Sequence, residues 1–99
     1  MNDINELIQE IDQVNDYLKD MYQDIEDTIF LGHDQEDEVH LEIKGNFEIK
    51  SIKWDEKHFE GKQVELSRKI IEAYNQASEA VKHDRQAVVY NVINEKMRF

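Results

Sequence analysis

Apolar residues recur through the first quarter of the sequence at spacings that alternate between three and four. The pattern runs without a miss through Ile4, Leu7, Ile11, Val14, Leu18, Met21 and Ile25. It is the a and d pattern of a heptad repeat, and it predicts a helix over residues 3–26. Such a helix is about 35 Å long. A single domain of 99 residues buries only a modest share of its surface, so few of its other residues are available to pack against this stripe.

Two interpretations of the stripe are open. In the first, an amphipathic helix packs only on the sheet of its own chain. In the second, the helix also packs on a partner chain, because Ile8, Tyr17 and Tyr22 widen the stripe beyond one seam. The second interpretation predicts a homodimer, and it places Ile4, Leu7 and Ile11 at the interface.

The middle of the chain has the alternation of β-strands. Apolar and polar residues alternate around residues 27–32, 38–44 and 47–54, which we expect to form three antiparallel strands. Gly45-Asn46 indicates a tight two-residue hairpin turn. The apolar parity changes between Ile49 and Ile52, which predicts a β-bulge or bend near Lys50-Ser51. Trp54 then falls on the core face, where packing under the helices is favoured over stacking on a ligand.

A polar segment, residues 33–38, separates the first two strands and is expected to be a mobile, solvated loop. Phe59 is expected to anchor the connection after the third strand, and Gly61 to break the chain before a last helix over 61–97. The apolar stripe of this helix is interrupted at residues 82–86, which are all polar. The helix either continues through that stretch or kinks there, and no proline forces a break. The predicted fold is a single α+β domain over residues 1–99.

The charge is unevenly distributed. Residues 1–38 hold 13 acidic residues and one lysine, a net charge of -12, whereas residues 39–99 hold 10 acids and 11 bases. An acidic first third repels polyanions. Cysteine is absent, which excludes disulfides and fits a reducing compartment. We find no signal peptide and no apolar run of the length that a membrane span needs.

No motif for chemistry is present. The four histidines lack zinc-ligand spacing, and residues 33–38 do not match a calcium-binding loop. Nucleophile motifs and phosphate-binding glycine loops are also absent. The sequence therefore predicts a non-enzymatic protein without metal or cofactor.

Basic residues of the last third are candidate contacts to nucleic-acid phosphates. The candidates are Lys82, Arg85, Lys96 and Arg98, with Lys62 behind them. An ordinary solvated helix surface is the alternative interpretation.

A series of landmarks runs from Gly32 to Ala77. They are the loop-opening Gly32, the strand Val39-His40-Leu41-Glu42-Ile43, the turn glycine Gly45, Ile52-Lys53-Trp54-Asp55, Phe59-Glu60, and the helical Ile70-Ile71-Glu72-Ala73-Tyr74-Asn75-Gln76-Ala77. In these landmarks and their spacing, the chain resembles the YbaB/EbfC family of nucleoid-associated proteins. The long first helix also fits. Two features depart from the family's pattern: the loop is acidic where the family has glycines, and the first helix carries only one base, Lys19.

The resemblance implies a helix–three-strand–helix fold and a tweezer-like homodimer whose helices project as arms. It implies that the sheets of two chains meet, which brings Phe47, Ile49 and Trp54 to the interface. It also implies DNA binding with little sequence preference, in the nucleoid of a bacterial cytoplasm. The acidic departures support an alternative, in which the chain is a dimeric module that has lost DNA binding and meets a basic protein partner.

Overall fold

The computed structural model describes residues 2–96, with side chains described from residue 4 to residue 95. The chain is elongated, about 70 × 19 × 17 Å. Its elements are, in order, α1 (Asn2–Asp27), β1 (Ile29–His33), β2 (His40–Lys44), β3 (Ile49–Lys53) and α2 (Gln63–Lys96). The expected α+β fold, with a three-stranded antiparallel sheet between two long helices, is confirmed.

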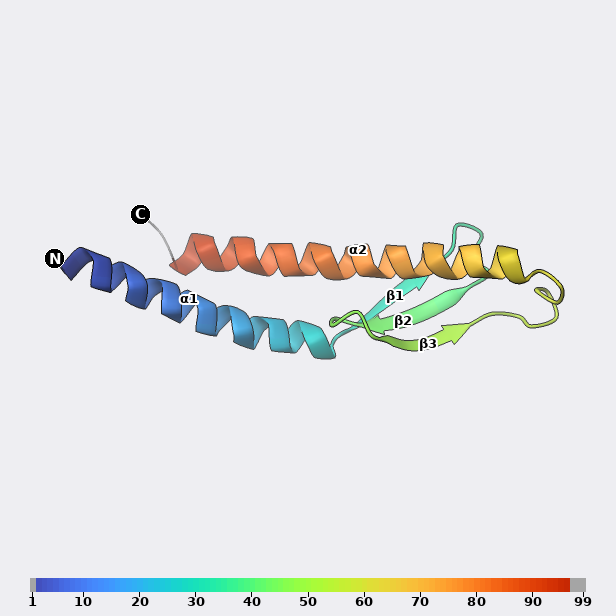
Figure 1. Cartoon of the computed structure of the whole chain (residues 1–99), viewed down its shortest axis with the longest axis horizontal. Helices are drawn as coiled ribbons and strands as arrows, with labels where there is room; N and C mark the ends of the chain where they lie inside the picture. Colours follow the sequence, from blue (N-terminus) through green and yellow to red (C-terminus); the bar gives the residue numbers. More distant parts are fainter. Residues whose placement is uncertain (1, 97–99) are drawn as a thin grey trace.

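Helix α2 runs along the long axis of the molecule, and the N-terminal turns of α1 extend beyond its end (Figure 1). Its N-terminal half lies over the sheet, and its C-terminal half runs beside α1, so that the free ends of both helices lie at the same end of the molecule. The helix is continuous through residues 82–86, which decides between the two alternatives left open by the sequence. We call the paired part of α1 and α2 the arm.

The sheet has the strand order β1-β2-β3, and both pairs are antiparallel. In the second pair Glu42 faces Ser51, but the next residue, Ile43, faces Ile49. Lys50 is therefore the extra residue of a β-bulge. The bulge predicted from the change of apolar parity is confirmed.

The β2–β3 turn differs from the expected two-residue form. The Phe47 amide donates to the Lys44 carbonyl at 2.8 Å, and the Lys44 amide donates to the Glu48 carbonyl at 2.8 Å. Phe47 takes a left-handed backbone with φ 71°, so the loop is Gly45, Asn46 and Phe47, a three-residue hairpin. Gly45 is needed for another reason: a Cβ there would collide with the Ile25 carbonyl at the end of α1.

The core lies between the sheet and α2. Val39, Leu41 and Ile43 are buried on the sheet side, and small residues of α2, Ala73 and Ala77, are buried against them. A Cβ at Gly32 would overlap the Ala73 carbonyl and crowd the Ala77 methyl group. Glycine at this position therefore sets how closely β1 and α2 approach.

Trp54 corrects an expectation. It is 37% exposed rather than packed under the helices. Helix α2 contacts β1 and β2, and within the described residues it makes no contact with β3. The parity argument placed Trp54 on the core face, but α2 does not reach as far across the sheet as β3.

Element ends differ from the expected ones by one to two residues, each for a local reason. The β2–β3 turn includes the first residues of the predicted third strand. At the end of α1, the Thr28 amide donates a hydrogen bond to the Ile25 carbonyl, so the helical turn continues to the residue before Thr28. Phe59 is buried, as expected of an anchor, and Gly61 has φ 76°. Helix α2 therefore starts at Gln63 rather than residue 61. The predicted end at residue 97 lies outside the described residues.

Candidate nucleic-acid interface

The predicted DNA-contacting residues are spread along α2. Lys62 lies just before its first turn, and Lys96 lies in its last described turn. With a rise of about 1.5 Å per residue, the two are roughly 50 Å apart. The side chain of Lys96 and the whole of Arg98 lie outside the described part of the chain. The described members of this set are thus spread along the length of α2 and do not form one patch.

Lys62 and Lys82 are exposed. Lys82 Nζ lies 3.5 Å from Glu79 Oε1, a surface pair on successive turns. Such exposed pairs contribute little and exchange readily with other partners. Lys62 has no ion pair among the described side chains. Both ammonium groups are therefore accessible to an anionic ligand.

Arg85 is engaged inside the chain. Its guanidinium donates to the Gly45 carbonyl at 2.7 Å, and it lies over the rings of Tyr22 and Phe47, 5.5 and 5.2 Å from their centroids. These contacts join α2 to α1 and to the β2–β3 turn. The geometry gives Arg85 a structural role, which competes with the phosphate contact expected from the sequence.

Exposed lysines that the sequence reasoning missed lie on β3 and in the connection after it: Lys50, Lys53 and Lys57. None has an ion pair among the described side chains. The sequence could have indicated these lysines, because Lys50 and Lys53 flank the change of apolar parity on an edge strand. A short segment separates them from Lys62, so they add accessible cations at the sheet end of the molecule.

The acidic loop before β2 contains a buried ion cluster. Lys69 Nζ of α2 lies 3.3 Å from Asp34 Oδ2, 3.2 Å from Glu36 Oε2 and 3.0 Å from Glu38 Oε1. His58 Nε2 contacts the other Glu38 oxygen. Three of the loop's carboxylates thus share one buried lysine, which offsets part of their negative charge and holds them to α2.

Asp34 also organises the loop backbone. Its Oδ1 accepts the amides of Glu38 and Val39 at 2.7 and 2.6 Å, and its Oδ2 accepts the Glu36 amide at 3.2 Å. The expectation of a solvated loop is wrong at Asp34, which is fully buried. The spacing of acids gave no sign of this, because the partner Lys69 is 35 residues away.

The cluster shifts the ionisation of its members. Burial opposes ionisation of Asp34, but the hydrogen bonds from Val39, Glu38, Lys69 and Glu36 outweigh it and lower its pKa to about 2. The hydrogen bond from Lys69 is the main reason that the pKa of Glu38 is also lowered. Burial disfavours the charged form of Lys69, yet its carboxylate partners raise its pKa. Asp34, Glu38 and Lys69 are therefore all charged at neutral pH.

The carboxylates of α1 contrast with those of the loop. Eight of them have described side chains, and none pairs with a cation among the described residues. They are Glu6, Glu10, Asp12, Asp16, Asp20, Asp24, Glu26 and Asp27. The acidic first third therefore divides into a loop whose charge is partly compensated by Lys69 and a helix whose described carboxylates have no cationic partner among the described residues.

The residues predicted for a dimer interface are placed differently from one another. Ile4, Leu7 and Ile11 are exposed on the N-terminal half of α1; Ile49 is exposed at the start of β3, and Trp54 is exposed just beyond its end. These residues are accessible to a partner. Phe47, in contrast, is partly buried against the core and under Arg85, so most of its ring is already used within the chain.

Metal and membrane sites were also sought. Across residues 2–96, no three side chains of His, Asp or Glu come together in a way that could hold a metal ion. Over the same range, neither α1 nor α2 offers a window that is long and apolar enough to cross a lipid bilayer.

Comparison with known proteins places these features in context. The family model described as the YbaB/EbfC DNA-binding family matches residues 1–97. No curated protein matches the chain. Among solved structures, the fold is similar to the crystal structure of the uncharacterized protein HP0035 from Helicobacter pylori. The TM-score is 0.76 at 17% identity, over 90% of this chain and 95% of that one.

Proposed function

Because this chain belongs to the YbaB/EbfC DNA-binding family, we propose that it is a nucleoid-associated protein that binds DNA through the phosphate backbone, with little sequence preference. The family match over residues 1–97 is the observation that carries the proposal. The proposed site of action is the nucleoid in the bacterial cytoplasm. No catalytic step is part of the proposal.

The proposed DNA contacts are the accessible cations along α2 and at the sheet end. Lys62 and Lys82, about 30 Å apart along α2, are the main described candidates. Lys53 and Lys57 add contacts at the sheet end. The expected contacts of the Lys96 side chain and of Arg98 lie outside the described residues. Spaced lysines without a shared pocket favour point contacts to phosphates over recognition of base edges. Arg85 acts mainly by holding the β2–β3 turn to α2.

The proposed active form is a homodimer. Two features support it: β3 is an edge strand that α2 leaves uncovered, and the apolar side chains of Ile49 and Trp54 are exposed along and just beyond it. Edge strands of this kind pair readily with a second chain. Light scattering at micromolar concentration should give twice the mass of the 11.9 kDa chain. A monomeric mass would contradict this part of the proposal.

A mobility-shift titration at low salt tests DNA binding. We expect two duplexes of equal length and unrelated sequence to shift at the same protein concentration. Nonspecific binding has dissociation constants of roughly 1–100 μM at physiological salt and tightens as salt is lowered. No shift at tens of micromolar protein would therefore contradict the proposal.

A second candidate function is favoured by the uncompensated carboxylates of α1. In that candidate, the protein keeps the family fold but meets a basic protein in place of DNA. A charge-reversed α1 variant separates the two functions. Reversal should strengthen DNA binding by removing repulsion, and it should weaken binding to a basic partner.

A further inference from the structure

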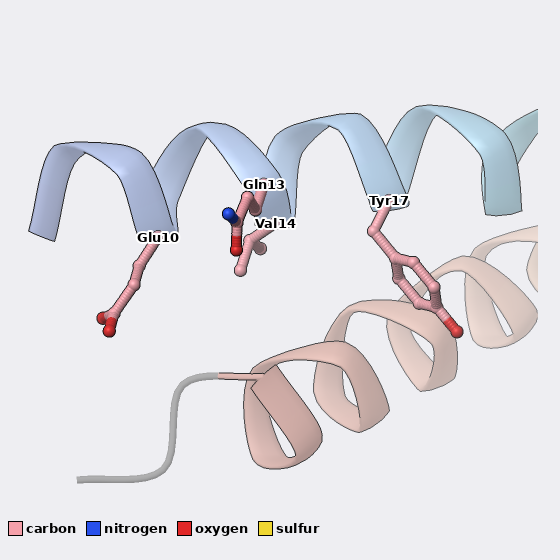
Figure 2. Close-up of a pocket in the computed structure, with 4 residues that line it drawn as sticks. All are labelled: Glu10, Gln13, Val14 and Tyr17. Atoms are coloured by element: carbon pink, nitrogen blue, oxygen red, sulfur yellow. The ribbon is translucent and has the colours of Figure 1, made fainter. Parts of the chain in front are cut away.

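A hollow lies along the side of α1 that faces the last turns of α2, toward the free end of the arm. It has a volume of about 210 Å³ and is lined by Glu10, Gln13, Val14 and Tyr17. Figure 2 shows these four side chains on the flank of α1 that faces the C-terminal turns of α2. We call this hollow the arm cleft. Its volume is below the roughly 300 Å³ at which small-molecule sites begin, so it suits single side chains of a docked segment better than a cofactor.

An apolar face continues from the cleft toward the N-terminus. Val14 is buried, but Leu7 and Ile11 on the same helix face are each 42% exposed. The spacings of four and three residues place these side chains along one stripe. The arm therefore begins as a packed helix pair and ends with an apolar surface on α1 that no described residue covers.

Charge indicates what would cover this surface. Helix α1 carries nine carboxylates and one lysine, and none of its described carboxylates has a cationic partner within the described residues. Glu10 brings one of these charges into the arm cleft itself. A second copy of α1 would bring like charges together, and DNA would be repelled. Only a cationic occupant would gain from both the apolar stripe and the carboxylates around it.

We propose that the arm cleft, together with Leu7 and Ile11, is a docking site for a cationic amphipathic helix of another protein. The apolar face of that helix would lie along Leu7, Ile11 and Val14, and a lysine or arginine beside it would pair with Glu10. This is the helix-in-groove mode of recognition. The sequence interpretation gave Leu7 and Ile11 to a homodimer, and the placement of charge now favours a partner of opposite sign. The proposal goes beyond DNA binding and does not depend on it.

A designed peptide serves as the probe. We suggest a fluorescent peptide of about 18 residues, long enough to span the exposed part of α1, with leucines on one helix face and lysines on the other. Its control has the same composition in an order that spreads the leucines around the helix. The amphipathic peptide should bind the full-length protein at least about tenfold more tightly than the control, because only it presents a continuous apolar face.

Two charge-reversed variants locate the site. Glu10→Lys places the change in the cleft, and Asp12→Lys makes the same change in net charge two residues away, on another side of the helix. Glu10→Lys should weaken peptide binding roughly tenfold and Asp12→Lys much less. Leu7→Ser should also weaken binding without changing charge. Circular dichroism checks that each variant keeps its helices.

Several results would overturn the proposal. If both peptides bound equally tightly, general charge attraction would explain the binding. If Glu10→Lys and Asp12→Lys weakened peptide binding equally, the peptide would not bind in the cleft. If Glu10→Lys alone changed the molecular mass, the occupant of the cleft would be a second copy of the chain. If Glu10→Lys changed DNA affinity more than Asp12→Lys did, the occupant would be DNA. None of these results bears on whether the unmodified protein binds DNA, so the two proposals fail separately.

Discussion

Lys69 Nζ lies 3.3 Å from Asp34 Oδ2 in a position where both side chains are 1% exposed. The pair connects the middle of α2 to the loop between β1 and β2, across 35 residues of sequence. Asp34 in turn accepts three loop amides. One buried ion pair thus fixes both the shape of the acidic loop and its attachment to the helix.

The first prediction concerns this pair. Lys69→Met leaves Asp34 and its neighbouring carboxylates without their cation, and the loss of one partner of a buried pair is strongly destabilising. We expect the thermal midpoint to fall by more than about 10 °C, measured by circular dichroism. Lys69→Met combined with Asp34→Asn should recover part of the loss. A single variant as stable as the parent would contradict the role of the pair.

The second prediction concerns pH. Against the effect of burial, the hydrogen bonds to Asp34 lower its pKa in the folded protein to about 2, from an ordinary value of 3.8. A carboxyl whose pKa is lowered by folding stabilises the protein when the pH is above the pKa of that carboxyl in the unfolded chain. This stabilisation is lost as the pH falls toward its pKa in the folded protein. Urea unfolding should therefore show stability declining between pH 4 and pH 2. Asp34→Asn should flatten this decline, and a variant with an unchanged profile would assign it to other carboxyls.

The third prediction concerns the contact between β1 and α2. Gly32→Ala introduces a methyl group that overlaps the Ala73 carbonyl, so the helix must move away from the sheet. We expect a loss of about 1–3 kcal/mol in the free energy of unfolding, from urea titration. Leu31→Ala on the adjacent, 72% exposed position is the control and should cost much less. Similar losses at both positions would argue against a steric role for Gly32.

The fourth prediction separates two basic residues that the sequence treats alike. Arg85→Ala removes the bond to the Gly45 carbonyl and the contacts with two rings, and it should lower the free energy of unfolding by about 1–3 kcal/mol. Lys82→Ala should leave stability nearly unchanged and weaken DNA binding. If Arg85→Ala instead weakened DNA binding without any loss of stability, Arg85 would be a phosphate contact.

Local patterns in the sequence predicted most of the fold. The heptad spacing predicted α1, the parity change predicted the bulge at Lys50, and Gly61 predicted the break before α2. These features depend on neighbours along the chain. The coverage of the sheet was not predictable in this way, because the exposure of Trp54 depends on how far α2 extends across β3.

The candidate site was less predictable, because contacts between residues far apart in the sequence decide which charged side chains are paired inside the chain and which are accessible. Lys69 and Arg85 both lie on the core-facing side of α2, in register with Ala73 and Val81 respectively. A basic residue on an apolar face was the available signal that each is used internally. A count of charge along the chain cannot distinguish the loop carboxylates that pair with Lys69 from the unpaired ones of α1.

The most direct test of the proposed function is the salt dependence of DNA binding, measured by fluorescence anisotropy of a labelled duplex. We predict that the logarithm of the binding constant falls linearly with the logarithm of salt concentration, because each phosphate contact releases counterions. Replacing Lys62 and Lys82 with alanine should reduce the slope by about 2, roughly one for each lost contact. Binding that does not change with salt, or no binding at low salt, would contradict the account.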